Sequence, residues 1–306
     1  MRKIRTYHEV DSDSGSTLVD QVVAQRDRLA QRLGTVASVV AVASGKGGVG
    51  KSAVTANLAA VLASRGLRVG ALDADLNGPS LARMLGSLGE TLGDGPDGVV
   101  PAVGAAGVHV MSMELLQGAS DAPLRWKEPS SDRFIWQSAL ETGALREFLS
   151  DVAWGHLDFL VVDVPPGTDK IGRLLELVPG IDQLLLVCTP SEMSRAVVAR
   201  SLTQVREAGV ESVGLVANMT EYVCPGCGDR HPLFPGDGVQ RLAREAGVDI
   251  WADVPFDPRM GASTDQGAPA VLAVPDSPAS AGIRQLADRV VSAAKKPVRN
   301  KEEVEP

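Results

Sequence analysis

The sequence predicts an α/β fold, a mostly parallel sheet of about seven or eight strands with helices on both faces. Two observations lead to it. Short runs that are apolar throughout alternate with helical patterns, and a glycine-rich loop follows the first run. Strands covered on both faces are apolar throughout, whereas half-exposed strands alternate apolar and polar residues. The expected strands are Val39–Ala43, Val69–Leu72, Val108–Ser112, Phe159–Asp163, Leu184–Cys188, Val213–Ala217 and Ile250–Val254.

Helical patterns separate many of these runs, as the crossovers between parallel strands require. The expected helices are Ser52–Ser64, Ala139–Ser150, Glu192–Ala208, Val239–Ala246 and Pro278–Ala294. Gly93–Pro101 is rich in glycine and aspartate, so we expect a turn-rich excursion there. Because no repeat or strong linker divides the chain, we treat residues 36–295 as one domain.

The two ends of the chain differ from this domain. Residues 1–35 form an N-terminal extension with an amphipathic helix at Thr17–Leu33. Its apolar positions recur at helical spacing, at Leu18, Val22, Leu29 and Leu33. We expect this helix to pack on the main domain, and partner binding is the alternative. Residues 296–306 are charged and are expected to be disordered.

Composition and charge exclude several classes of function. The net charge of −8 argues against a general nucleic-acid binder, which is usually basic. No apolar run approaches the ~18 residues that span a membrane, and the first residues lack the apolar core of a secretory signal. Three cysteines are too few for a disulfide framework, so a reducing cytoplasm is expected. We therefore expect neither a nucleic-acid nor a membrane partner.

The stretch "SGKGGVGKS" fits two phosphate-binding patterns. The shorter pattern, G-x-G-x-x-G, uses Gly45, Gly47 and Gly50, and Asp73 ends the next strand where a dinucleotide enzyme has its ribose-binding acid. The longer pattern, G-x-x-x-x-G-K-S, also includes Lys51–Ser52, for which a dinucleotide loop has no use. A phosphate-binding loop is therefore favoured over a dinucleotide oxidoreductase, and the expected fold is that of a P-loop NTPase.

Each part of this loop has a chemical role. Backbone N–H groups of the glycines converge on phosphate oxygens, and the following helix adds its positive N-terminal dipole. Lys51 is expected to reach the β- and γ-phosphates, and the Ser52 hydroxyl to ligate Mg²⁺. The predicted nucleotide-binding residues are Gly45, Lys46, Gly47, Gly48, Val49, Gly50, Lys51, Ser52 and Ala53.

Three aspartates follow two of the predicted strands. Asp163 in "FLVVDVPPGT" fits a Walker-B carboxylate that orients Mg²⁺, although an aspartate at a strand end is often only a cap. Asp73 and Asp75 in "LDADLNGPS" lie two residues apart, so an extended strand places both on one side. We expect Ser52, Asp73 and Asp163 at the magnesium ion, and Asp75 to orient the attacking water.

Two cysteines in "CPGC" have the spacing that lets a tight turn aim both sulfurs at one metal. Cys188 lies in an apolar strand, and His231 is expected to face solvent rather than to ligate. A four-thiolate site therefore needs two chains, and a twofold dimer can place one bridging 4Fe–4S cluster between two copies of Cys224 and Cys227. Zinc held in the same way, or a redox cysteine pair, are the alternatives.

Lys46 is unusual, because an ordinary phosphate loop needs no lysine there. The run "GKGGVGKS" resembles the deviant Walker A motif of the nitrogenase iron protein and of Min-type and Par-type ATPases. The resemblance implies that Lys46 reaches across a sandwich dimer to the partner's nucleotide and stabilises the transition state as an arginine finger does. Lys46 and Asp75 are therefore the expected catalytic residues.

From residue 38 to about residue 294 the order of motifs resembles the Mrp-type iron–sulfur cluster carrier ATPases. The matching segments are the loop, "LDADLNGPS", "DVPPGT", "VANM" followed by "YVCPGC", "VPFDPR" and "PDSPAS". The resemblance implies a cytoplasmic homodimer that binds ATP, holds a labile bridging cluster and passes it to apo-proteins. It also implies that Asn218 hydrogen-bonds adenine, since an amide offers a donor and an acceptor side by side.

The sequence departs from that family at several positions. They are Ala53, where a hydroxyl residue is usual, Asp169–Lys170, where Gly-Asp is usual, Glu128, where glycine is usual, and Ala217, where glutamate is common. Nucleotide binding is expected to survive these changes, and hydrolysis is expected to be slow.

A second class of function remains open, a ParA/MinD-like dimerisation switch in positioning or partition with a structural zinc at the cysteine pair. Such switches often carry a C-terminal amphipathic membrane helix. The candidate stripe here is Ile283, Leu286, Val290 and Val291. It lacks the bulky aromatics and dense lysines of a membrane helix, so we expect it to face the core. The cysteine pair favours the cluster carrier, because a switch has no need of it.

Overall fold

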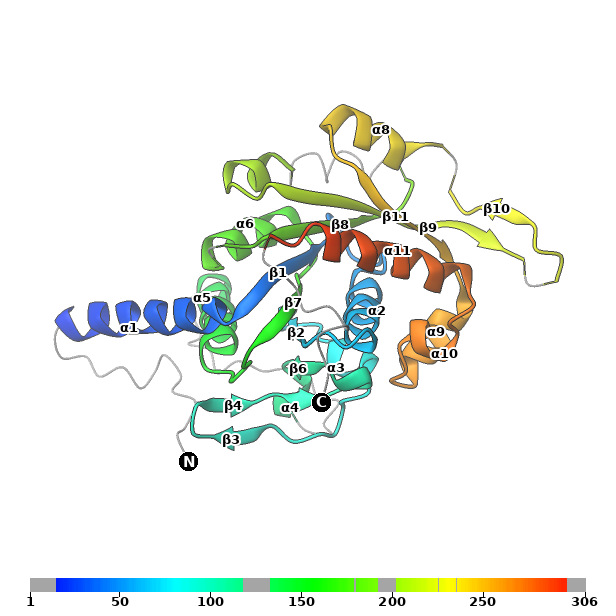
Figure 1. The fold of residues 1–306 in the computed structure, drawn as a ribbon. Helices are drawn as coiled ribbons and strands as arrows, with labels where there is room; N and C mark the ends of the chain where they lie inside the picture. The colour runs from blue at the N-terminus through cyan, green and yellow to red at the C-terminus, as the bar shows by residue number, and fades with distance from the viewer. Residues whose placement is uncertain are drawn as a thin grey trace.

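The computed structural model describes residues 15–117, 133–178, 180–191, 202–224, 226–234 and 236–295. Within them, nine strands form the main sheet, in the order β10-β9-β8-β1-β7-β2-β6-β5, with β11 also paired to β9 (Figure 1). The strands are β1 (Val36–Ala43), β2 (Val69–Asp73), β5 (Ala102–Val103), β6 (His109–Met111), β7 (Leu157–Asp163), β8 (Gln183–Cys188), β9 (Ser212–Val223), β10 (Arg230–Pro232) and β11 (Ile250–Phe256).

The sheet is mostly parallel, as predicted. All seven expected strands form and pair in parallel, while the short β5 and β10 add antiparallel edges to β6 and β9. The sequence did not indicate β5 and β10, because two or three residues carry no recognisable period. β9 runs six residues beyond its predicted end at Ala217 to Val223, because β10 and the end of β11 pair with this extension.

Helices cover both faces of the sheet (Figure 1). The described helices are α1 (Gly15–Gly34), α2 (Lys51–Ser64), α3 (Leu81–Met84), α4 (Glu114–Gln117), α5 (Arg133–Ser150), α6 (Thr168–Leu177), α8 (Gly238–Ala246), α9 (Pro258–Asp265), α10 (Ala270–Ala273) and α11 (Pro278–Ser292). One apolar cluster joins one face of the sheet to α5, α6 and α8, and a second joins the other face to α2, α10 and α11.

Strand β1 shows why apolar residues follow one another without a break. Successive side chains of a strand point to opposite faces. Val39 and Ala41 accordingly enter the first cluster, while Val40 and Val42 enter the second. All four are buried, so a polar residue at any of them would lose its contact with water on either face.

The predicted N-terminal helix forms, and its C-terminal half packs on the domain. Leu29 is buried and Leu33 packs against the same cluster, beside α5. Arg32 Nε also donates to the Ser150 carbonyl at 3.3 Å. Val23 is 51% exposed, and Figure 1 shows the start of α1 extending away from the sheet. The side chains of Leu18 and Val22 lie outside the described residues.

The candidate membrane stripe belongs to the core, as expected. Ile283, Leu286 and Val290 on α11 are all fully buried, and α11 packs against β11 and α2. Val291 packs partly buried against the same cluster. In the described part of the chain, no helix combines the length and apolarity that a bilayer crossing needs.

Several elements differ from the sequence prediction. Gly93–Pro101 contains a small hairpin of β3 (Gly93–Gly95) and β4 (Gly98–Val100). Helix α6 was missed, although Ile171, Leu174 and Leu177 are buried at a spacing of three. The four-residue helices α3, α4 and α10 were also not predicted, because so short a helix has too few turns to show a hydrophobic period. Of the helix expected at Glu192–Ala208, residues 202–207 are helical and residues 192–201 lie outside the described residues, as do residues 1–14 and 296–306.

The packing of α11 on β11 yields a stability prediction. A Cβ at Gly282 would overlap the Asp253 carbonyl oxygen, which is backbone and cannot rotate away. Gly282→Ala should therefore push the helix off the strand and cost about 1–3 kcal/mol of unfolding free energy. Gly261→Ala in helix α9 is the matched control, since no atom lies near its Cβ position. That change should stabilise by about 0.4–1 kcal/mol. Urea denaturation measures both, and equal effects would contradict the packing argument.

Candidate nucleotide-binding and metal-binding sites

The glycine-rich loop connects β1 to α2 at the carboxyl end of the central strand, where parallel sheets bind ligands. Gly48 and Gly50 have positive φ angles of 77° and 83°, which side chains rarely adopt. A Cβ at Gly50 would also overlap the amide of Asn218 on β9. The loop shape therefore requires glycine at these positions, and it leaves backbone N–H groups at the start of α2.

Lys51 and Ser52 meet the carboxylate of Asp163 at the end of β7. Lys51 Nζ lies 2.6 Å from Asp163 Oδ2, and Ser52 Oγ donates to the same oxygen at 2.6 Å. The side chains of Lys51 and Asp163 are 7% and 0% exposed. Oxygen ligands from a hydroxyl and a carboxylate are those that Mg²⁺ prefers, so the convergence of Ser52 and Asp163 fits a magnesium site beside the phosphate loop.

Thr55, which the sequence analysis missed, contacts the second oxygen of the Asp163 carboxylate. Thr55 is fully buried, and its Oγ1 lies 2.7 Å from Asp163 Oδ1 and 3.0 Å from the Lys51 carbonyl oxygen. A hydroxyl has one proton, so the shorter contact to the charged carboxylate is its donation. Asp163 thus has donors on both oxygens. Position 55 lies one helical turn beyond Lys51, which is the signal that could have pointed to it.

Asp73, the other predicted magnesium ligand, holds a loop in this structure. Its Oδ2 accepts from the backbone N–H groups of Ser80 and Leu81 at 2.8 and 2.9 Å, and its Oδ1 accepts from the N–H of Asp75 at 3.1 Å. Burial, together with the charge of Asp163 beside it, raises the pKa of Asp73 well above its ordinary value, although these N–H groups partly oppose the rise. The observed contacts make Asp73 the anchor of residues 75–81, and its role as a metal ligand stays a prediction.

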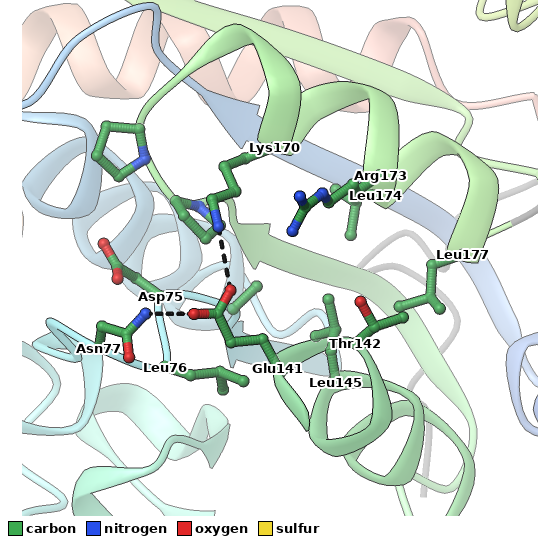
Figure 2. A pocket seen from close by; sticks show the side chains of 13 residues that line it. Asp75, Leu76, Asn77, Glu141, Thr142, Leu145, Lys170, Arg173, Leu174 and Leu177 are labelled. Carbon is green, nitrogen blue, oxygen red and sulfur yellow. Dashed lines mark hydrogen bonds and ion pairs between the residues drawn. The ribbon is translucent and has the colours of Figure 1, made fainter. Parts of the chain in front are cut away.

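Asp75 lies in the same loop and lines a cavity of about 250 Å³. The cavity lies between this loop, residues Pro165 and Pro166 after β7, and helices α5 and α6 (Figure 2). Among the described contacts of Asp75, Oδ1 accepts from the N–H of Gly78 at 3.1 Å. The side chain therefore borders an open volume at the ligand-binding edge of the sheet, where a group that orients a water is expected.

The residues that depart from the family pattern differ in how far they are buried. Lys170 lines the cavity and pairs with Glu141 on α5, at 3.0 Å. Ala217 is buried in β9, and Ala53 is half-buried in the first turn of α2. Glu128 lies outside the described residues.

Asn218 contacts the phosphate loop directly. Its Nδ2 donates to the carbonyl oxygen of Val49 at 2.8 Å, and its side chain lies against Gly50. The residue is 7% exposed. The amide thus fixes the loop from β9, and its predicted contact with adenine stays a prediction.

The two lysines of the loop lie in different environments. Lys51 is buried at its ion pair, whereas Lys46 is exposed and its Nζ donates to Ser191 Oγ at 3.3 Å. An exposed lysine on a flexible stem can reach a group outside its own chain. The geometry is therefore compatible with different roles for Lys46 and Lys51.

The cysteine pair lies between β9 and β10, on an arm that projects from the sheet (Figure 1). The turn is fixed by two backbone bonds, from Cys224 N to the Asp229 oxygen at 2.9 Å and from Gly228 N to the Cys224 oxygen at 2.8 Å. Cys224 is half-buried and Cys227 is exposed. Backbone N–H groups of Cys227 and Gly226 lower the pKa of the Cys224 thiol, which favours the thiolate that metals bind.

The remaining candidates do not join this pair. Burial raises the pKa of Cys188 to about 12, as expected for an inert core thiol. His231 is exposed on β10, in register with Tyr222. Among the residues that the structure describes, no three His, Cys, Asp or Glu side chains form a metal-binding group. The described part of the chain therefore offers two accessible cysteines at this turn, Cys224 and Cys227.

The arrangement of the loop, Lys51, Ser52 and Asp163 is that of a P-loop NTPase, a class that binds and hydrolyses nucleoside triphosphates. The family model described as ParA, NUBPL iron-transfer P-loop NTPase, matches residues 35–291. The chain belongs to this family, which confirms the resemblance and the fold predicted from the sequence.

Relatives of known name agree with this assignment. An iron–sulfur cluster carrier protein of Saccharolobus solfataricus is 37% identical over 272 residues, which are 89% of this chain and 88% of the relative. The cytosolic Fe-S cluster assembly factor NUBP2 of Bos taurus is 38% identical, over 85% of this chain and 94% of the relative.

Solved structures agree in fold. A nucleotide-binding protein of Archaeoglobus fulgidus, in complex with ADP, is 33% identical with a TM-score of 0.68, over 79% of this chain and 91% of that one. The cell division ATPase MinD of Pyrococcus furiosus is 26% identical with a TM-score of 0.57, over 84% and 99%.

The contact of Thr55 yields a prediction for the site. Thr55→Val keeps the shape of the side chain but leaves Asp163 Oδ1 without its donor in a buried position. Because the acceptor left unpaired is a charged carboxylate, the unfolding free energy should fall by about 2–3 kcal/mol. Thr55→Ser retains the hydroxyl and should lose only the contribution of one methyl group, about 1 kcal/mol. Urea denaturation of both variants measures the difference, and a valine variant as stable as the serine variant would show that the hydroxyl is dispensable.

Proposed function

We propose that this protein is an ATP-binding and ATP-hydrolysing carrier of iron–sulfur clusters in the cytoplasm. Two copies form a homodimer that holds one labile 4Fe–4S cluster and transfers it to apo-proteins. The observation that carries the proposal is a pair of accessible cysteines on a projecting arm of a P-loop NTPase. The names of the relatives support the same cargo.

The nucleotide half of the proposal uses the loop and its neighbours. Residues 45–53 bind the phosphates, with Lys51 as the counter-charge of the β- and γ-phosphates. Ser52 and Asp163 hold Mg²⁺, which when bound neutralises charge on the phosphate oxygens. Asp73 fixes the loop of Asp75, and Asp75 orients the attacking water. Asn218 contacts adenine.

Lys46 provides the link between nucleotide and dimer. It is the exposed lysine of the loop, and it stabilises the charge that develops on the partner subunit's nucleotide. Hydrolysis then depends on the association of two copies. The clients are proteins that lack their cluster, and they receive it from the same exposed arm.

The cluster half of the proposal follows from ligand number. A 4Fe–4S cluster takes four thiolates, and each chain offers Cys224 and Cys227 at the end of β9. In a twofold-symmetric dimer both subunits present the same surface at the axis. An axis beside the arm therefore brings four thiolates together. Both cysteines are at least partly exposed, so a cluster there remains accessible to a client.

The two lysines separate binding from hydrolysis. Lys51→Ala removes a buried charge from the phosphate site and should weaken ATP binding by about 100-fold or more. Lys46→Ala should leave ATP affinity within about threefold and lower the hydrolysis rate by about a thousandfold, the size of an arginine-finger effect. Calorimetric titration and phosphate release measure the two quantities. Equal loss of affinity in both variants would contradict this division.

The cysteines test the bridging cluster. After anaerobic reconstitution with iron and sulfide, the wild-type protein should hold about one cluster per dimer, because four thiolates close one site. Cys224→Ser or Cys227→Ser should each abolish loading, since either change deletes two of the four ligands. Cys188→Ser is the matched control and should load fully. Iron, sulfide and zinc are quantified per chain. The molecular mass of the loaded species is measured in parallel, to distinguish monomer from dimer. Full loading of a monomer, or zinc in place of iron, would overturn the proposal.

A further inference from the structure

Glu141 on α5 connects two loops of the nucleotide edge. Its Oε1 accepts from Asn77 Nδ2 at 2.7 Å, and its Oε2 accepts from Lys170 Nζ at 3.0 Å (Figure 2). Both carboxylate oxygens are therefore in use, each toward a different segment of the chain. This three-residue bridge of Asn77, Glu141 and Lys170 lies along the cavity that Asp75 also lines.

One of the two segments carries Asp75, the proposed water-orienting group, and the other follows Asp163, the proposed magnesium ligand. Asn77 belongs to the loop after β2, two residues beyond Asp75. Lys170 belongs to the first turns of α6, directly after the loop that leaves Asp163 at the end of β7. Helix α5, which carries Glu141, forms no part of the phosphate loop. The bridge thus ties the Asp75 loop and the Asp163 loop to a common outside support.

The ion-pair half of the bridge is better shielded from solvent than its other half, because Asn77 is exposed. The side chains of Glu141 and Lys170 are 16% and 28% exposed, so solvent screens the pair less than an ion pair on the surface. Burial raises the pKa of Glu141, but the hydrogen bonds from Asn77 and Lys170 and the charges of Lys170 and Arg173 outweigh it, and the net shift is downward. Glu141 is therefore the charged acceptor of the bridge at neutral pH.

Glu141 also determines what Lys170 contacts. Among the described residues that line the cavity, Asp75 and Glu141 are the carboxylates, and Lys170 pairs with Glu141. As long as this pair holds, the ammonium group of Lys170 is directed to Glu141 rather than to Asp75. Without Glu141, Asp75 is the carboxylate that remains among the described residues lining the cavity.

We propose that Glu141 is a positioning residue for nucleotide hydrolysis, which holds the Asp75 loop against the Asp163 loop through Asn77 and Lys170. The inference rests on the proposed hydrolytic role of Asp75 and adds a residue outside the phosphate loop. A carboxylate that orients a water must stay within a fraction of an ångström of its productive place. The bridge supplies this fixation from helix α5, which forms no part of the phosphate loop.

The test combines turnover with a measurement that needs no turnover. In Glu141→Ala we expect the ATP hydrolysis rate to fall about tenfold or more, with the KM for ATP within about twofold. Hydrogen exchange of the backbone amides of residues 74–80 should become faster. Arg146→Ala is the matched control, because Arg146 is an exposed residue of the same helix. It should change neither quantity.

A charge reversal distinguishes the bridge from a general loss of packing. The double variant Glu141→Lys, Lys170→Glu rebuilds the ion pair with the charges exchanged. The side-chain amide oxygen of Asn77, Oδ1, can then accept a hydrogen bond from the new ammonium group. We expect this double variant to recover most of the rate and the slow exchange, whereas Glu141→Lys alone should recover neither. A double variant as slow as the single one would overturn the proposal.

Two further outcomes separate this inference from the proposed function. If Glu141→Ala lowers the melting temperature but leaves the hydrolysis rate and the exchange of residues 74–80 unchanged, Glu141 is only structural and the inference fails. If the wild-type protein does not hydrolyse ATP, the proposed function fails, while the exchange measurement still decides whether the bridge fixes the loop.

Discussion

The buried carboxylate of Asp163 is the group on which the nucleotide site depends. It ends β7, between β1 and β2 in the sheet, and it is fully buried. A charge in that position is costly unless partners surround it. Lys51 and Ser52 meet one of its oxygens and Thr55 the other, all three from the first turns of α2. This group of contacts fixes α2 on the sheet and therefore sets the shape of the loop that precedes it.

The register of the sheet extends this constraint to the neighbouring segments. Asp163 pairs with Val42 at the end of β1 and with Asp73 at the end of β2. The phosphate loop and the Asp75 loop therefore start from the same level of the sheet as the carboxylate. Asp73 then directs its loop by accepting from the N–H groups of Ser80 and Leu81. The two buried aspartates at adjacent strand ends therefore hold different elements. Asp163 binds side chains of helix α2, and Asp73 binds the backbone of the loop that follows β2.

Strand β9 is the element that the two sites share. Asn218 in its middle donates to the phosphate loop at Val49, and Cys224 follows its last residue. Cys224 lies six positions beyond Asn218, and the backbone between them departs from a regular strand at Met219, whose φ angle is 57°. The loop of the nucleotide site and the arm that carries the cysteine pair are therefore connected through one strand, β9. The arm projects because β8 pairs with β9 only as far as Ala217, and among the described strands β10 and the end of β11 pair with the rest of it.

The sequence by itself determined the parallel sheet, the phosphate loop with Lys51 and Ser52, the strand-end aspartates and the cysteine pair. These features are local: a run of valines, a glycine with a required backbone angle or a C-x-x-C turn is complete within a few residues. Tertiary structure alone decided that Thr55 supports Asp163, that Asp73 anchors a loop, that Asn218 holds Val49 and that Glu141 bridges Asn77 and Lys170. Each of these contacts joins residues from different elements. A single glutamate or threonine in a helical pattern carries no sign of its distant partner, because the partner is set by strand order and helix packing rather than by spacing along the chain.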